Sequence, residues 1–121
     1  MIKNGYVPKL INLLKTPSYR AKTLKLLYHL SVDDRCKSMF TYTDGIPILI
    51  GMVINFPQDN LAKELAALMV NLSHNNRNVE LMIANKGLNL LMDRFSDKRD
   101  PLLLKIIRNI SQWTFNQQQV E

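Results

Sequence analysis

The 121-residue sequence has few cysteines, glycines, prolines and long apolar runs, and each shortage excludes a class of protein. The single cysteine, Cys36, excludes an internal disulfide framework and fits a reducing compartment. Four glycines and five prolines are too few for a low-complexity or collagen-like chain, and 46% hydrophobic residues argue against disorder. No apolar run is long enough to span a bilayer and the first residues resemble no signal peptide, so we expect a cytoplasmic chain without membrane insertion.

Residues that carry out chemistry are also sparse. The two histidines, His29 and His74, have no cysteine or carboxylate at a helical spacing suited to a metal ion. The sequence has no glycine-rich phosphate loop, and its carboxylates are scattered, with no apolar pocket in the pattern to raise a pKa. We therefore expect no enzymatic activity, no metal ion and no cofactor.

Positive charge, in contrast, is in excess. Lysine and arginine number 16 against 10 acidic residues, which gives a formal net charge of +6. Such a balance favours acidic partners, whether nucleic acid, an anionic membrane or an acidic peptide. Charge alone does not choose among them.

A short apolar pattern ending in serine occurs three times. It reads LLYHLS at 26–31, LMVNLS at 68–73 and IIRNIS at 106–111, so the copies lie about 40 residues apart. A period of this length is typical of a helical solenoid, whose units stack on a shared core and present a long surface to another polypeptide. The pattern therefore favours binding over catalysis.

Glycines and prolines divide each repeat into helices. We expect three glycines to adopt the left-handed conformation after a helix end, with Pro8 and Pro47 starting the helix that follows. Three further prolines mark a corner before the last helix of each unit, and polar residues beside them can cap that helix. The glycines are Gly5, Gly45 and Gly87, and the prolines and polar neighbours are Pro17 with Ser18, Pro57 with Asp59 and Pro101 with Asp100. The polar segments 33–35 and 75–77 leave room for a short first helix, and a short, a medium and a long helix per unit is the order of an armadillo repeat.

We therefore predict an all-α fold, a right-handed superhelical armadillo-repeat solenoid of about three repeats of three helices. Residues 1–31 would form a partial repeat lacking most of its first helix, 32–73 and 74–113 two repeats, and 114–121 a frayed tail. Because neither end looks like a polar capping repeat, we expect a piece of a longer array that can self-associate through its uncapped ends.

The three long helices each predict a buried stripe and a polar stripe. If His29, Asn71 and Asn109 are equivalent, the same three positions stay apolar in every unit: Leu26, Leu27 and Leu30, then Leu68, Met69 and Leu72, then Ile106, Ile107 and Ile110. The opposite stripe is polar and mostly basic, and amide and lysine side chains suit a peptide backbone and acidic side chains. Our candidate partner-binding groove is Lys22, Lys25, His29, Lys63, Ala67, Asn71, Lys105 and Asn109, and the alternative is a solvated helix surface.

Several runs resemble one family within the armadillo proteins. The segment YHLSVDDRCKSMF at 28–40 with YTD at 42–44, NRNV at 76–79 and DPLLLKIIRNIS at 100–111 are similar, in this order, to the middle repeats of kinesin-associated protein, the non-motor subunit of heterotrimeric kinesin-II. The resemblance implies an adaptor that binds the tails of the motor subunits, links them to cargo and acts in cytoplasmic and ciliary transport along microtubules. It marks no tail-binding residues, so the groove assignment rests on the stripe alone.

Three alternatives remain open at this point. A nuclear import receptor of the alpha type clamps basic peptides with a tryptophan one turn before each groove asparagine, but those positions here are Lys25, Ala67 and Lys105, which would repel a basic ligand. Nucleic-acid binding is suggested only by the net charge, without interleaved exposed aromatic residues. A structural spacer within a longer array is the third.

Overall fold

The computed structural model describes the backbone of residues 6–120 and the side chains of 7–115, and this part of the chain is helical with no strand. The first unit contains α1 (Tyr6–Leu13) and α2 (Pro17–Leu30). The second contains α3 (Asp34–Thr41), α4 (Gly45–Ile54) and α5 (Lys63–Leu72). The third contains α6 (Asn76–Ile83), the short 3₁₀ helix η1 (Ala84–Lys86), α7 (Gly87–Lys98) and α8 (Pro101–Val120).

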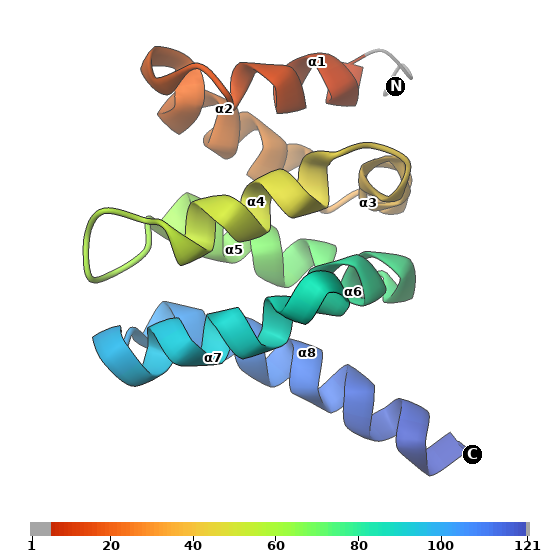
Figure 1. The fold of residues 1–121 in the computed structure, drawn as a ribbon. Coiled ribbons are helices and arrows are strands. Elements are labelled where there is room, and N and C mark those ends of the chain that lie inside the picture. Colours follow the sequence, from red (N-terminus) through yellow and green to blue (C-terminus); the bar gives the residue numbers. More distant parts are fainter. Residues whose placement is uncertain (1–5, 121) are drawn as a thin grey trace.

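Equivalent helices of successive units lie side by side (Figure 1). Helix α2 packs on α5 and α5 on α8, which makes one row of the stack. Helix α4 packs on α7 and α3 on α6. The architecture is an all-α, armadillo-like solenoid, as the 40-residue period predicts.

The apolar stripe of the last helices forms much of the core. Leu27 and Met69 are fully buried, and Ile107 nearly so. Burial of such a side chain contributes roughly 1.5–3 kcal/mol. The predicted stripe is wrong at Leu26, which is 53% exposed, and Leu30 is only partly buried. The matching residues Leu68 and Ile106 are fully buried, on helices α5 and α8 that each pack against the last helix of the preceding unit. Within the described residues, α2 is the first helix of this row.

The glycines have a different role from the predicted one. No described glycine has a positive φ; the left-handed residues are Asn85, Lys86 and Arg99. Gly45 instead begins α4, where an added Cβ would lie 2.7 Å from the Phe40 ring. Gly87 begins α7, and a Cβ there would overlap the carbonyl group of Met82. Both glycines therefore allow close helix packing, while Gly5 lies outside the described residues.

The predicted corners and caps before the last helices are partly confirmed. Pro17 and Pro101 are the first residues of α2 and α8. Asp100 caps α8 by accepting a hydrogen bond from the Leu102 backbone N–H at 3.0 Å. Ser18, by contrast, lies inside α2, which follows an N-cap without a side-chain hydrogen bond.

The second unit departs most from the expected lengths. Helix α5 begins at Lys63, well after Pro57, so it has 10 residues, the same as α4. Asp59 lies in the intervening loop and pairs with Lys98 instead of capping a helix. At the other end, α8 continues to Val120, so the segment expected to form a tail is helical that far.

Polar residues start the two short helices. The Asp33 carboxylate accepts a hydrogen bond from the Arg35 backbone N–H at 2.7 Å and caps α3. Asn75 caps α6 in the same way, accepting from the backbone N–H groups of Arg77 and Asn78 at 2.9 and 3.2 Å. Such caps stabilise a helix by about 1 kcal/mol, and they explain the repeated polar segments at 33–35 and 75–77.

Candidate peptide-binding groove

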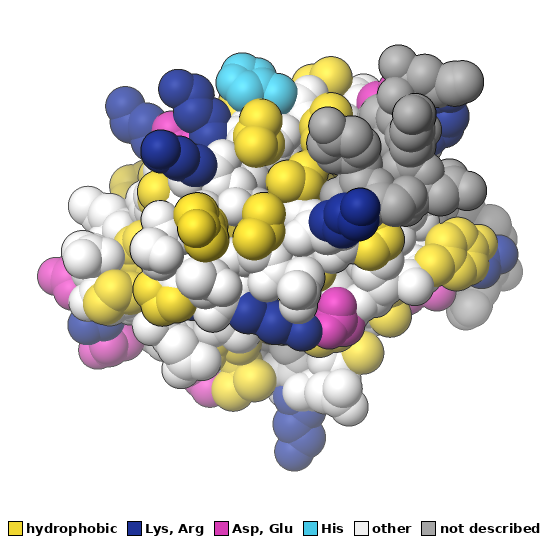
Figure 2. All heavy atoms as spheres, turned by 90° about the horizontal axis from the view of Figure 1, so that it is seen from above, with side chains coloured by type: hydrophobic (Ala, Val, Ile, Leu, Met, Phe, Trp, Pro, Cys, Tyr) yellow, Lys and Arg dark blue, Asp and Glu magenta, His cyan; other side chains and the backbone are white. Residues whose placement is uncertain are grey.

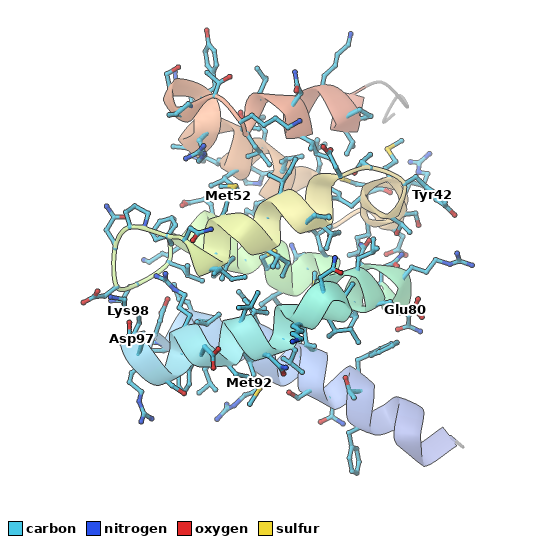
Figure 3. All side chains as sticks on the ribbon, in the orientation of Figure 1. Tyr42, Met52, Glu80, Met92, Asp97 and Lys98 are labelled. Carbon is cyan, nitrogen blue, oxygen red and sulfur yellow. The ribbon has the colours of Figure 1, made fainter. Side chains whose placement is uncertain are left out.

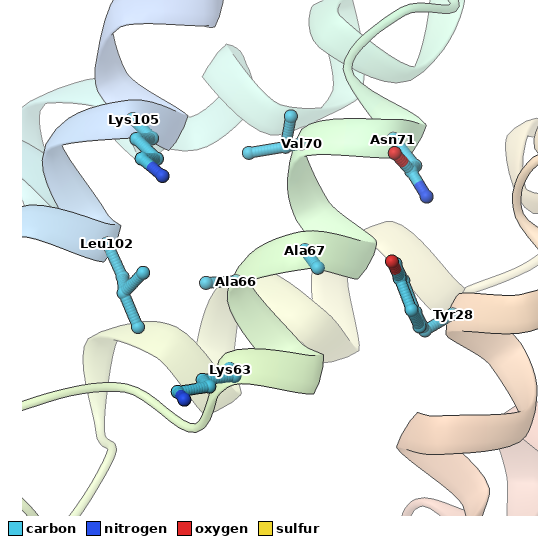
Figure 4. Close-up of a pocket in the computed structure, with 8 residues that line it drawn as sticks. All are labelled: Tyr28, Lys63, Ala66, Ala67, Val70, Asn71, Leu102 and Lys105. Carbon is cyan, nitrogen blue, oxygen red and sulfur yellow. The ribbon is translucent and has the colours of Figure 1, made fainter.

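Two adjoining pockets lie along the row formed by α2, α5 and α8. The first has a volume of about 360 Å³ and is lined by Tyr28, Lys63, Ala66, Ala67, Val70, Asn71, Leu102 and Lys105. Figure 4 shows Leu102 and Lys105 on α8 at one side of α5 and Tyr28 on α2 at the other. The second pocket, of about 220 Å³, is lined by Lys25, Tyr28, His29, Lys63, Glu64 and Ala67. The two share three residues, so we treat them as one groove.

The groove contains most of the side chains predicted for it. Lys25, His29, Lys63, Ala67, Asn71 and Lys105 all line one pocket or the other. Lys22 is exposed on α2 but lines neither, and Asn109 lines neither. The central part of the predicted polar stripe therefore lies in one groove.

The two asparagines are largely committed to holding the units together. The Asn71 side-chain N–H donates to the Ser31 hydroxyl at 2.9 Å, and the Asn109 side-chain N–H donates to the Ser73 hydroxyl at 3.1 Å. Each serine in turn donates to a backbone carbonyl of its own helix, Tyr28 and Val70 respectively, at 2.6 Å. The asparagine and serine side chains therefore form a hydrogen-bond ladder between the last helices of neighbouring units. For Asn71, the amide oxygen and the second N–H remain for a ligand.

The groove carries positive charge that no neighbouring carboxylate neutralises by direct contact. None of the ion pairs formed within the described part of the chain uses Lys22, Lys25, Lys63 or Lys105. One carboxylate, Glu64, lines the smaller pocket. An acidic partner would thus meet lysines that need not break an existing pair.

The structure adds groove residues that the polar stripe omitted. Tyr28, Ala66, Val70 and Leu102 supply most of the apolar wall of the larger pocket. Tyr28 and Val70 directly precede the equivalent residues His29 and Asn71, and Leu102 lies one turn before Lys105. The sequence signal for this wall is the apolar residues next to the polar stripe, which differ from the apolar stripe on the opposite face.

The only cysteine of the sequence lies in the interior. Cys36 is fully buried, and burial raises its thiol pKa to about 11, so the thiol stays protonated near neutral pH. Among the described residues, no cluster of histidine, cysteine or carboxylate side chains could hold a metal ion. None of the helices between residues 6 and 120 combines the length and the apolar character that crossing a membrane requires.

Comparison with known proteins bears on the family of the chain and on its all-α fold. No solved structure matches the chain. A family model described as kinesin-associated protein matches residues 1–120, nearly the whole sequence. The chain therefore belongs to the kinesin-associated protein family.

Proposed function

We propose that this chain is a non-enzymatic adaptor segment that binds the tails of kinesin-II motor subunits, or cargo polypeptides, in the groove along α2, α5 and α8. Membership of the kinesin-associated protein family supports the adaptor role. The observation that carries the binding surface is the pocket between α5 and α8, with Lys63 and Lys105 among its lining residues. In this role the protein acts in the cytoplasm, on the cytoskeleton and in the cilium.

The groove chemistry favours an acidic segment over a basic one. Four exposed lysines along the row attract carboxylates and repel the lysines and arginines of a nuclear import signal. The groove also lacks the tryptophan series that such a receptor uses, since Lys25, Ala67 and Lys105 occupy those positions. These residues support a motor or cargo segment rich in aspartate and glutamate.

Calorimetry with segments of the motor tails tests the proposal. Lys25→Glu combined with Lys105→Glu should weaken binding about tenfold or more, because two attractive charges become repulsive. A control with the same charge change, Lys9→Glu with Arg77→Glu, alters exposed residues of α1 and α6 that line neither groove pocket. Equal affinity of the two double variants would rule out the groove as the binding surface.

A further inference from the structure

The larger groove pocket is apolar inside and basic at its edge. Ala66, Ala67, Val70 and Leu102 contribute only carbon from their side chains, and the Tyr28 ring stands at the α2 side (Figure 4). Lys63 and Lys105 extend from α5 and α8 at the same pocket. Its volume of about 360 Å³ is at the small end of the range of ligand pockets, which suits one side chain better than a whole small molecule.

The sequence explains why the pocket is open. Ala67 occupies the position that is Lys25 on α2 and Lys105 on α8. The short alanine side chain leaves space between two long neighbours, so the row alternates a lysine, a gap and a lysine. The Ala66 side chain beside it is buried and equally short.

Charge around the pocket restricts what can occupy it. The smaller pocket, which shares Tyr28, Lys63 and Ala67, adds Lys25 and His29 on the α2 side and one carboxylate, Glu64, on α5. A ligand that places an apolar group in the larger pocket therefore has positive charge on both sides. Carboxylates next to that apolar group would meet these lysines, whereas basic neighbours would be repelled.

We propose that this pocket is a specificity site for one aliphatic side chain, leucine or isoleucine, flanked on both sides by aspartate or glutamate in a polypeptide partner. The proposal rests on the adaptor function above and adds a sequence preference to it. A purely acidic segment would bind by charge alone, and an aliphatic anchor supplies the remaining contact because it removes apolar surface from water.

Matched synthetic peptides test the preference. Two fluorescein-labelled probes carry a central leucine or alanine between the same flanking glutamates, and fluorescence anisotropy gives their affinities. We expect the leucine probe to bind about tenfold tighter than the alanine probe, because the additional buried carbons are worth about 1.4 kcal/mol by the usual conversion.

Filling the pocket should remove the preference. Ala67→Leu places a side chain in the space. The affinity of the leucine probe should therefore fall to that of the alanine probe. Ser38→Leu adds the same side chain on the exposed surface of α3 and should leave the tenfold ratio intact. Circular dichroism verifies folding of each variant, and Leu102→Ala, which enlarges the pocket, should also reduce the ratio if Ala67→Leu does not fold.

Three results would overturn the proposal. These are equal binding of the two probes to the unaltered protein, a tenfold ratio that survives both Ala67→Leu and Leu102→Ala, and displacement of the leucine probe by a random single-stranded oligonucleotide or anionic vesicles as readily as by unlabelled peptide. If the probes bind equally or the ratio survives both variants, the specificity pocket is wrong, but the proposed groove function stands as long as motor-tail binding depends on Lys25 and Lys105. If motor-tail binding does not depend on these lysines, both the groove function and the specificity pocket are wrong.

Discussion

Asn78 is a fully buried polar residue that joins three segments of the chain. Its side-chain N–H groups donate to the backbone carbonyls of Lys37 at 2.8 Å and Leu72 at 3.3 Å, and its oxygen accepts from the Thr41 hydroxyl at 2.8 Å. It therefore ties α6 both to the end of α5 and to α3 of the preceding unit.

Replacement of Asn78 by alanine should lower the free energy of unfolding by about 3 kcal/mol. The change removes three hydrogen bonds at a buried position, each worth about 1 kcal/mol. The Thr41 hydroxyl loses its Asn78 acceptor, whereas the Leu72 carbonyl keeps the Asn75 backbone N–H at 3.2 Å. Urea denaturation measures the effect. Asn76→Ala, at the exposed first residue of α6, should change stability by less than about 0.5 kcal/mol, and a similar loss in both variants would contradict this account.

For single residues, the sequence predicts which positions are equivalent better than it predicts their hydrogen-bond partners. The period placed Asn71 and Asn109 at equivalent points, and the structure confirms their equivalence by giving both the same hydrogen bond. Their partners, Ser31 and Ser73, belong to the preceding unit, and a helical projection of one helix shows only its own neighbours. The serine that follows each apolar run is nevertheless a signal of these partners, because a residue repeated with the period of the units can contact its counterpart's neighbours in the next unit.

The loop at 55–62 illustrates how one element is held by another. Arg94 on α7 donates to the carbonyls of Ile54, Phe56 and Gln58 at 3.2, 3.0 and 2.7 Å. Asp100 accepts from the Leu61 backbone N–H at 2.7 Å. Lys98 pairs with Asp59 at 3.3 Å, and Figure 3 shows Lys98 directed toward this loop.

Loss of the Arg94 contacts should release this loop while the first unit stays intact. Arg94→Leu removes three charge-assisted hydrogen bonds, each worth about 1.5–3 kcal/mol. Hydrogen exchange followed by mass spectrometry should show backbone amides of 55–62 exchanging at least about tenfold faster. Arg77→Leu, an exposed change on α6, should have no such effect. Faster exchange spread evenly over α1 to α8 would instead indicate global destabilisation.

This loop also explains the main error in the predicted elements. A corner at Pro57 with a cap at Asp59 predicts an early start for α5, but the helix begins at Lys63. Arg94 on α7 and Asp100, about 40 positions later, hold the intervening chain in a loop. The prediction of left-handed glycines is wrong for a related reason. Their small size matters at Gly45 and Gly87 because of the distant Ile11 and the neighbouring Phe40 and Met82, and local turn preference does not include such packing.

At the scale of the whole molecule, the first and last described units expose surfaces with the chemistry of the internal interfaces. Ile11, Ile50 and Met92 are the last residues of three repeated segments, VPKLI at 7–11, IPILI at 46–50 and LNLLM at 88–92. These equivalent residues are 1%, 8% and 49% exposed. Leu26, Leu68 and Ile106 are also equivalent, and only Leu26, at 53%, is exposed. The α1–α2 end, seen in Figure 2, gathers hydrophobic side chains among lysine and arginine.

The hydrogen-bond ladder is open at the same two ends. His29 occupies on α2 the position from which Asn71 and Asn109 donate to the preceding unit. Ser111, exposed on α8, matches the accepting serines Ser31 and Ser73. In a head-to-tail pair of chains, His29 of one copy would therefore face Ser111 of the other. Such a contact joins two different surfaces and does not close, so it would build chains of increasing length.

Two aspartate variants separate this head-to-tail contact from other modes of association. Sedimentation equilibrium of the unaltered chain at tens of micromolar should show a concentration-dependent rise in mass, whereas Leu26→Asp and Met92→Asp should each be monomeric, since each buries a charge in one of the two surfaces. Tyr42→Asp, at a 79% exposed residue on the α3–α4 edge, should associate like the unaltered chain.

An equimolar mixture of Leu26→Asp and Met92→Asp retains one intact surface of each kind and should form one-to-one dimers. A symmetric contact between like surfaces would instead leave one variant associating by itself, because its own surface would be unaltered.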